Sequence, residues 1–328
     1  MSELVLPTFQ QNMVNRGKIS GQDVLELRRK KYDDGQICRG EAEQLFALDK
    51  SVKIKCEEWF QFFNEAIVNY VLSSSGMAGD VSNECADWLI RCTSRHGVVE
   101  SHERMEMLIC VLEKANQVPT SLQTFALKQV EIGVLENQGP VDRGRFAARN
   151  VICRADVAMI RRLMFALGGS GGMAVTKLEA EFLFNLNDAT IERQNDPAWS
   201  DLFVKAIANH LLATNGDSTP DRQAVLREDQ FLSGDTMTNF LTNSLKSLLK
   251  AMKPLGDQLE QSDRDSNNLT AAELSKAEII TDQEKQWVLE KINRDSVLHE
   301  NEVALVEFLA KEAPNLPQEL KSMLKQAS

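Results

Sequence analysis

Four short segments of the sequence end in a glutamate that opens an expected helix. Their residue types suit either helix capping or cation binding. The segments run over residues 34–41, 96–103, 172–179 and 295–302. In the first, Asp34 and Glu41 frame a glycine and an isoleucine with the spacing of the second half of an EF-hand calcium loop. Carboxylate oxygens are the ligands that calcium prefers, so these segments are candidate divalent-cation sites.

The candidate metal ligands are the acidic residues of these segments: Asp34, Glu41, Glu103, Glu179, Asp295 and Glu302. This set is incomplete, because Lys30 and Tyr32 stand where the first segment needs its two leading acidic ligands. Calcium takes about six to eight oxygen ligands, so none of the segments is a complete calcium loop. Helix capping stays open as an alternative. A glutamate three residues after a threonine, as in Thr176 and Glu179, completes a capping box at the positive end of a helix.

The Asp-Gly-x-Ile-x-x-x-Glu pattern between two expected helices resembles the TerB-type tellurite-resistance family. The resemblance covers each segment with its flanking helices, and it implies an all-α bundle. It also implies a role in metal-linked stress responses or in membrane-associated complexes. The positions that match the metal-binding carboxylates of the family are Asp34, Glu41, Asp295 and Glu302. The second and third segments keep only Glu103 and Glu179.

Motifs of catalysis are weak in this sequence. Residues 168–172 match the G-x-S-x-G pattern of a nucleophile elbow, but an amphipathic helix is expected at 157–167, where that motif needs a strand. The zinc-protease motif HExxH, the Walker A motif and the dinucleotide-binding fingerprint do not occur. We therefore expect that the protein is not an enzyme.

The expected helices around the four segments repeat, because both halves of the chain carry the same parts in the same order. The four tryptophans form two matched pairs, Trp59 with Trp199 and Trp88 with Trp287. The segments before the first pair also match, residues 41–49 with residues 179–187. Self-similarity of this kind indicates an internal duplication, and we expect the tryptophans to be core anchors of two related domains.

Apolar residues recur at three- and four-residue spacing, as in Met105, Leu108, Ile109 and Leu112, which predicts amphipathic helices. Strand-like alternation is nearly absent. The predicted fold class is all-α, with two tandem homologous helical-bundle domains, the second carrying an insertion. The predicted parts are an N-terminal arm at 1–18, domain 1 at 19–138, a basic linker at 139–151, and domain 2 at 152–328 with its insertion at about 214–276.

Composition and charge indicate which partners and which cellular location to expect. The chain of 328 residues has a net charge of −11, and an acidic protein repels the phosphates of nucleic acid, so we expect no nucleic-acid partner. No stretch approaches about 18 apolar residues, and the first residues do not form a secretory signal, so we expect no integral membrane segment and a cytoplasmic location. Six cysteines without a CxxC pair are typical of reduced thiols.

Together these features favour a non-enzymatic cytoplasmic interaction or scaffold protein with a protein partner. The basic linker supplies candidate partner-binding residues, which are Arg143, Arg145 and Arg149. The alternative function is a divalent-metal-responsive binding protein of the TerB or EF-hand type, and a divalent cation is the one cofactor left open. The sequence does not predict the oligomeric state.

Overall fold

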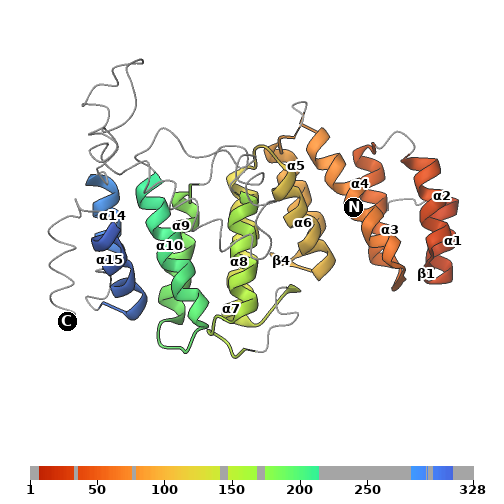
Figure 1. Ribbon diagram of the computed structural model, residues 1–328. Coiled ribbons are helices and arrows are strands. Elements are labelled where there is room, and N and C mark those ends of the chain that lie inside the picture. The colour runs from red at the N-terminus through yellow and green to blue at the C-terminus, as the bar shows by residue number, and fades with distance from the viewer. Residues whose placement is uncertain are drawn as a thin grey trace, which may run out of the picture. The chain divides into compact units, whose positions relative to one another are not determined.

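A computed structural model describes residues 7–32, 36–75, 79–140, 147–167, 174–213, 282–292, 294 and 298–312. These residues are predominantly helical, which confirms that part of the predicted fold class (Figure 1). Within the described residues, no helix is long and apolar enough to cross a membrane. The predicted insertion at 214–276 lies outside the described residues.

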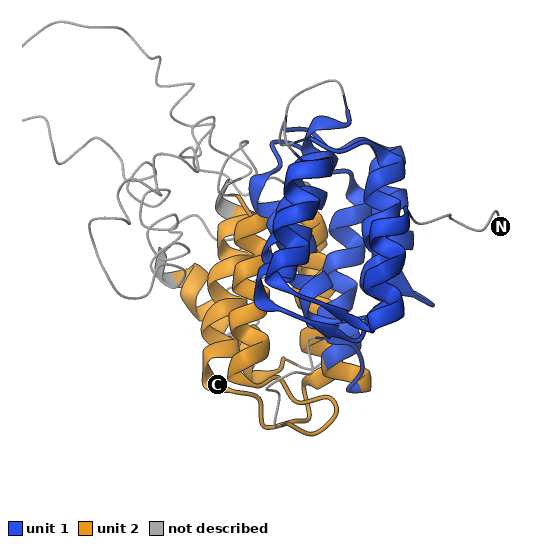
Figure 2. Ribbon diagram, turned by 90° about the vertical axis from the view of Figure 1, so that its right-hand side faces the viewer, with its two compact units in different colours: residues 1–133, 137–144 blue, residues 134–136, 145–328 orange. Residues whose placement is uncertain are grey.

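The chain divides into two compact units, which Figure 2 shows in different colours. Unit 1 consists of residues 1–133 and 137–144, and unit 2 of residues 134–136 and 145–328. The elements up to residue 136 are α1 (Thr8–Arg16), β1 (Lys18–Ile19), α2 (Gly21–Lys31), α3 (Arg39–Ser51), β2 (Ile54–Lys55), α4 (Glu57–Ser73), α5 (Asn83–Thr93), β3 (Ser94–Arg95), β4 (Val98–Val99), α6 (His102–Lys114) and α7 (Thr120–Glu136). Those that follow are α8 (Arg154–Leu167), α9 (Lys177–Thr190), α10 (Pro197–Ala213), α14 (Asp282–Ile292) and α15 (Glu300–Glu312).

In unit 1, α4 is the central helix and packs against α2, α3 and α6. Its apolar face places Trp59, Phe62 and Ile67 in the core, where these side chains are fully or almost fully buried. The ring of Phe46 on α3 meets the ring of Trp88 on α5 edge-on, at 5.8 Å between centroids. Edge-to-face contacts of this kind add to the burial of apolar area, so both tryptophans of this half anchor the core as the sequence predicts.

In unit 2, α10 is the central helix and packs against α8, α9 and α15. It buries Trp199 and Phe203 completely. Phe184 on α9 meets Trp287 on α14 edge-on, at 5.5 Å between ring centroids. An aromatic contact therefore joins α3 to α5 in unit 1, and another joins α9 to α14 in unit 2.

A short β-hairpin over residues 94–99 overlaps the segment 96–103, in a sequence where strand-like alternation is nearly absent. β3 and β4 pair antiparallel, with Ser94 opposite Val99 and Arg95 opposite Val98. The two turn residues, His96 and Gly97, both have positive φ, at 54° and 81°. Two-residue hairpin turns require this backbone, since its twist matches that of the paired strands.

The side chain of a glutamine in α7 forms hydrogen bonds with the backbone of this hairpin. Gln129 is almost fully buried, and its Oε1 accepts a hydrogen bond from the backbone N–H of Val99 at 2.9 Å. Its Nε2 donates to the backbone carbonyl of Gly97 at 3.0 Å. The side-chain amide thus satisfies the backbone groups of this short hairpin as a neighbouring strand would.

Four of the described helices follow an N-cap residue whose side-chain oxygen accepts a hydrogen bond from the backbone N–H of the third helical residue. Ser20, Ser82, Ser101 and Thr176 do so for α2, α5, α6 and α9. Helix α3 differs, because its N-cap is Cys38, whose thiol is a poor acceptor. The carboxylate of Glu41 accepts from the backbone N–H of Cys38 at 3.1 Å, and the Cys38 side chain faces the backbone N–H of Glu41, so this capping box has a sulfur in place of an oxygen.

We predict that Cys38→Ser stabilises unit 1 by about 0.5–1 kcal/mol, because an oxygen at this exposed N-cap accepts the backbone N–H of Glu41 more strongly than sulfur does. The measurement is the shift in the urea midpoint of tryptophan fluorescence. Cys38→Ala is the control, since it removes the thiol without adding an acceptor. Equal midpoints for the serine and alanine variants would contradict the prediction.

Candidate binding pockets

A pocket of about 450 Å³ opens in unit 1 where the C-terminal ends of α3 and α5 meet β3 and the beginning of α6. Its lining is rich in basic side chains: Lys50 from α3, Arg91 from α5, Arg95 from β3 and Arg104 from α6. One acidic residue, Glu100, also lines it, and the buried ring of Phe46 forms part of the wall.

Arg104 also lines this pocket, with a side chain that is only 6% exposed. Its guanidinium donates to Asp49 Oδ2 at 3.3 Å and to the backbone carbonyl of Cys92 at 3.4 Å, and it also pairs with Glu100. A buried guanidinium needs such partners because desolvation of an unpaired charge costs several kcal/mol. The arginine thereby joins α6 to the ends of both α3 and α5.

Asp49 is the second buried charge of this cluster. Its Oδ1 accepts from Trp59 Nε1 at 2.9 Å and from Lys55 Nζ at 2.5 Å. The two buried or half-buried bases, Lys55 and Arg104, are therefore matched by two acids, Asp49 and Glu100. The sequence prediction identified Trp59 as a core residue but did not recognise the carboxylate that its indole N–H requires.

A second pocket, of about 260 Å³, opens in unit 2. It is lined by Asp188 and Ile191 at the end of α9, Lys291 and Arg294 at the end of α14, and Glu302 in the first turn of α15. Arg294 forms an ion pair with Asp188 at 3.3 Å. Two acidic and two basic side chains line this pocket, so its charges balance.

The buried polar centre beside the second pocket is a neutral version of the first. Asn187 Oδ1 accepts from Trp199 Nε1 at 3.3 Å and from Asn301 Nδ2 at 2.7 Å. Asn187 is the residue that the sequence match pairs with Asp49. In each unit, a side chain near the end of one helix therefore holds the indole of the following central helix.

Four of the six candidate metal ligands lie among the described residues, and all four are in the first turn of a helix. Glu41, Glu179 and Glu302 each accept from the backbone N–H of the N-cap residue, at 3.1, 2.8 and 2.9 Å. Glu103 lies in the first turn of α6. These contacts are those of helix capping, in which a carboxylate also interacts favourably with the positive end of the helix.

The remaining metal candidates, Asp34 and Asp295, lie outside the described residues. Within the part of the chain that the structure describes, no group of three or more His, Cys, Asp or Glu side chains could hold a metal ion. The divalent-cation site therefore stays a prediction. Of the candidate partner-binding residues, Arg143 and Arg145 also lie outside the described residues, whereas Arg149 is an exposed residue of the turn that precedes α8.

Burial changes the acidity of two of the groups named above. It raises the pKa of the Cys92 thiol at the wall of the first pocket to about 11, so this thiol is neutral at physiological pH and is a poor nucleophile. Burial also raises the pKa of Glu179 to about 7, although the hydrogen bonds from Thr176 oppose the shift. Glu179 is only 2% exposed.

We predict that Asp49→Asn lowers the free energy of unfolding of unit 1 by about 2 kcal/mol. Asparagine keeps an acceptor for Trp59, as Asn187 does for Trp199, but it removes the negative charge that faces Lys55 and Arg104. Urea unfolding followed by tryptophan fluorescence measures the effect. Glu26→Gln is the control, because its ion pair with Lys30 is exposed and contributes little. An equal loss in both variants would refute the assigned role of Asp49.

We predict that Glu179 makes the stability of unit 2 fall as the pH rises from about 4.5 to about 7. In this window the folded state binds more protons than the unfolded state, whose glutamate titrates near 4.5. The loss across the window is on the order of 3 kcal/mol. Glu179→Gln keeps an acceptor for Thr176 and removes this titration, so its unfolding midpoint should depend less on pH. A variant with the same pH profile as the native chain would disprove the prediction.

A scan against protein-family models gave no match, and searches of the curated proteins and of the solved structures gave none either. The resemblance to the TerB-type family therefore stays a prediction.

Proposed function

We propose that the protein is a non-enzymatic interaction protein built from two related helical domains, each of which binds a partner at a pocket in the same place of its fold. The order of elements supports this relationship. Unit 1 contains α2, α3 and α4 followed by α5 and α6, and unit 2 contains α8, α9 and α10 followed by α14 and α15. The predicted insertion falls between α10 and α14, where the first half has a short connection.

The observation that carries the proposal is the correspondence of the two pockets. One lining residue of each pocket directly follows the side chain that accepts from the core indole: Lys50 follows Asp49, and Asp188 follows Asn187. Arg95 and Arg294 each lie seven residues after the matched tryptophan of α5 or α14. A pocket kept at one place in two diverged copies is explained by binding, since packing alone favours filling a void with side chains.

The different linings of the two pockets support two different ligands. The unit 1 pocket is lined mainly by basic side chains, whereas an ion pair between Asp188 and Arg294 crosses the lining of the unit 2 pocket. Complementary charge gives specificity in protein recognition, so sites of unlike charge select unlike partners. Two such sites on one chain suit a scaffold that holds two partners together.

Photo-crosslinking tests this proposal on the full chain. p-Benzoylphenylalanine replaces Ala47 at the first pocket or Ile191 at the second, and the purified proteins are irradiated in a lysate of the native cells. We expect discrete adducts whose identities, found by mass spectrometry, differ between the two positions.

The matched controls carry the crosslinker at exposed positions outside the pockets, Ile54 in unit 1 and Lys177 at the opposite end of α9. Adducts that are equally abundant from the control positions would contradict pocket-specific binding. The same adduct from both pockets would contradict the scaffold role.

A further inference from the structure

Three basic side chains at the unit 1 pocket have no counter-charge within the described part of the chain. Lys50, Arg91 and Arg95 are exposed, and none of them forms an ion pair with a described residue. Other arginines of the same unit are paired, as Arg28 is with Glu65 and Arg39 with Glu84. Cations that converge on one pocket without acidic partners repel one another, so an anion bound between them would relieve the repulsion.

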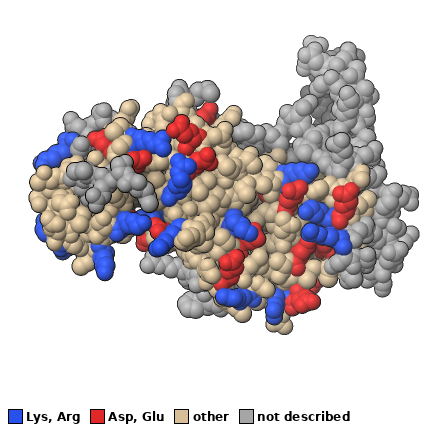
Figure 3. Space-filling model, turned by 180° about the vertical axis from the view of Figure 1, so that it is seen from behind, with Lys and Arg blue, Asp and Glu red and all other residues tan. Residues whose placement is uncertain are grey.

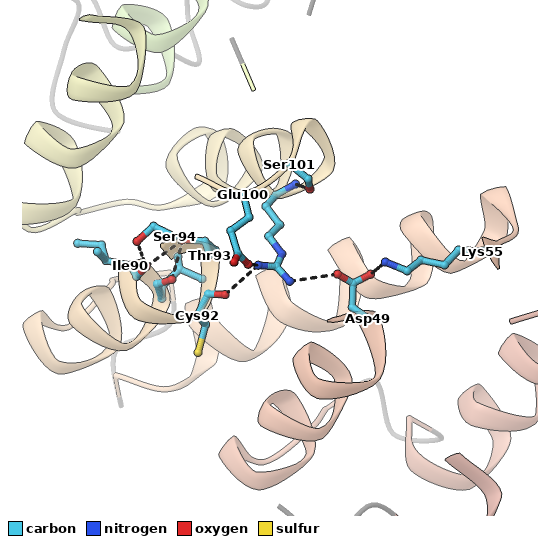
Figure 4. Close-up of polar contacts among 10 residues, drawn as sticks. Asp49, Lys55, Ile90, Cys92, Thr93, Ser94, Glu100 and Ser101 are labelled. Carbon is cyan, nitrogen blue, oxygen red and sulfur yellow. Dashed lines mark hydrogen bonds and ion pairs between the residues drawn. The ribbon is translucent and has the colours of Figure 1, made fainter. Parts of the chain in front are cut away.

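The ends of the helices do not by themselves require these cations. Lys50 and Arg91 lie in the last turns of α3 and α5, where a positive charge interacts favourably with the helix dipole. Carbonyls of the last turn of α5, however, already accept hydrogen bonds from other groups. Ser94 Oγ donates to the carbonyl of Ile90 at 2.6 Å (Figure 4), Arg104 donates to that of Cys92 at 3.4 Å, and the backbone N–H of Glu100 donates to that of Thr93 at 3.1 Å. Arg95 lies beyond the helix, in β3, and has no such role.

The excess of positive charge is confined to the surroundings of this pocket. The whole chain has a net charge of −11, and on the face shown in Figure 3 basic and acidic side chains are interspersed rather than segregated. The acidic residue of the lining, Glu100, forms an ion pair with Arg104. Arg104 also forms an ion pair with the buried Asp49. The three exposed cations of the lining are therefore left without a compensating acid among the described residues.

We propose that this pocket binds the phosphate of a phosphoserine or phosphothreonine on a partner protein. The inference rests on the proposed binding function and specifies its ligand. A phosphorylated side chain carries about two negative charges and three strong acceptor oxygens at neutral pH, which suit converging guanidinium groups. Clusters of arginine are a recurrent way to recognise such groups.

The exposure of the pocket favours a side chain of a partner over an enclosed small ligand. Lys50, Arg91 and Arg95 are all solvent-exposed, so the pocket does not surround its occupant as a small-molecule site does. The wall formed by Phe46 and Ala47 offers apolar surface for the carbon atoms next to the phosphate. The unit 2 pocket lacks this preference, because Asp188 and Glu302 line it.

Binding of fluorescein-labelled peptide pools to the full chain tests the proposal. The pools have randomised flanks around a central phosphoserine, phosphothreonine or unmodified serine, and fluorescence anisotropy at low salt measures affinity. We expect the phosphorylated pools to bind at least about tenfold more tightly than the unmodified pool, and the preference to weaken as salt screens the charges.

The pocket variant is Arg91→Glu with Arg95→Glu, and its matched control is Arg29→Glu with Lys53→Glu. The control reverses two exposed charges elsewhere in unit 1 and changes the net charge equally. We expect the pocket variant to lose the phosphate preference, and both the control and Arg91→Lys with Arg95→Lys to keep it. The urea midpoint of each variant shows that it is folded.

Two results would overturn the proposal. One is equal binding of phosphorylated and unmodified pools. The other is binding to phosphoinositide vesicles that exceeds binding to the phosphopeptides and depends on Arg91 and Arg95, since the ligand would then be a lipid headgroup. If adducts still form specifically from position 47 in either case, the pocket binds a partner of different chemistry and the proposed function survives.

Discussion

A carboxylate buried against an indole is the constraint on which the architecture of unit 1 depends. Asp49 cannot stay charged in the core without partners, and it obtains them from three directions: Trp59 on α4, Lys55 in β2 and Arg104 on α6. Because Arg104 is held there, it reaches the end of α5 through the carbonyl of Cys92. The pocket therefore lies where Arg104 compensates the buried carboxylate of Asp49.

Unit 2 reaches the same geometry without that charge. Asn187 presents an oxygen to Trp199 and receives a second hydrogen bond from Asn301, so no buried cation is needed beside it. Glu302 caps α15 there by accepting from the backbone N–H of His299. The unit with a core carboxylate thus has a pocket lined mainly by basic side chains, and the unit with a core amide has a pocket whose charges balance.

The sequence predicted local features more successfully than long-range ones. The helices, the burial of Trp59 and Trp199, and the capping box of Thr176 and Glu179 follow from short-range spacing and were anticipated. The contact between Asp49 and Arg104 joins residues 55 positions apart, and no periodic pattern marks it. The carboxylate ten residues before Trp59 and the amide twelve residues before Trp199 were a usable signal, because a buried indole N–H needs an acceptor.

The amide of Gln129 has a consequence for how any partner can approach the hairpin of unit 1. An exposed strand edge invites an extended peptide to add itself as a further strand through backbone hydrogen bonds. Here the glutamine side chain already occupies the N–H of Val99 and the carbonyl of Gly97. Addition of a partner strand through backbone hydrogen bonds is therefore blocked at these two groups. A partner peptide that binds there has to be recognised through its side chains.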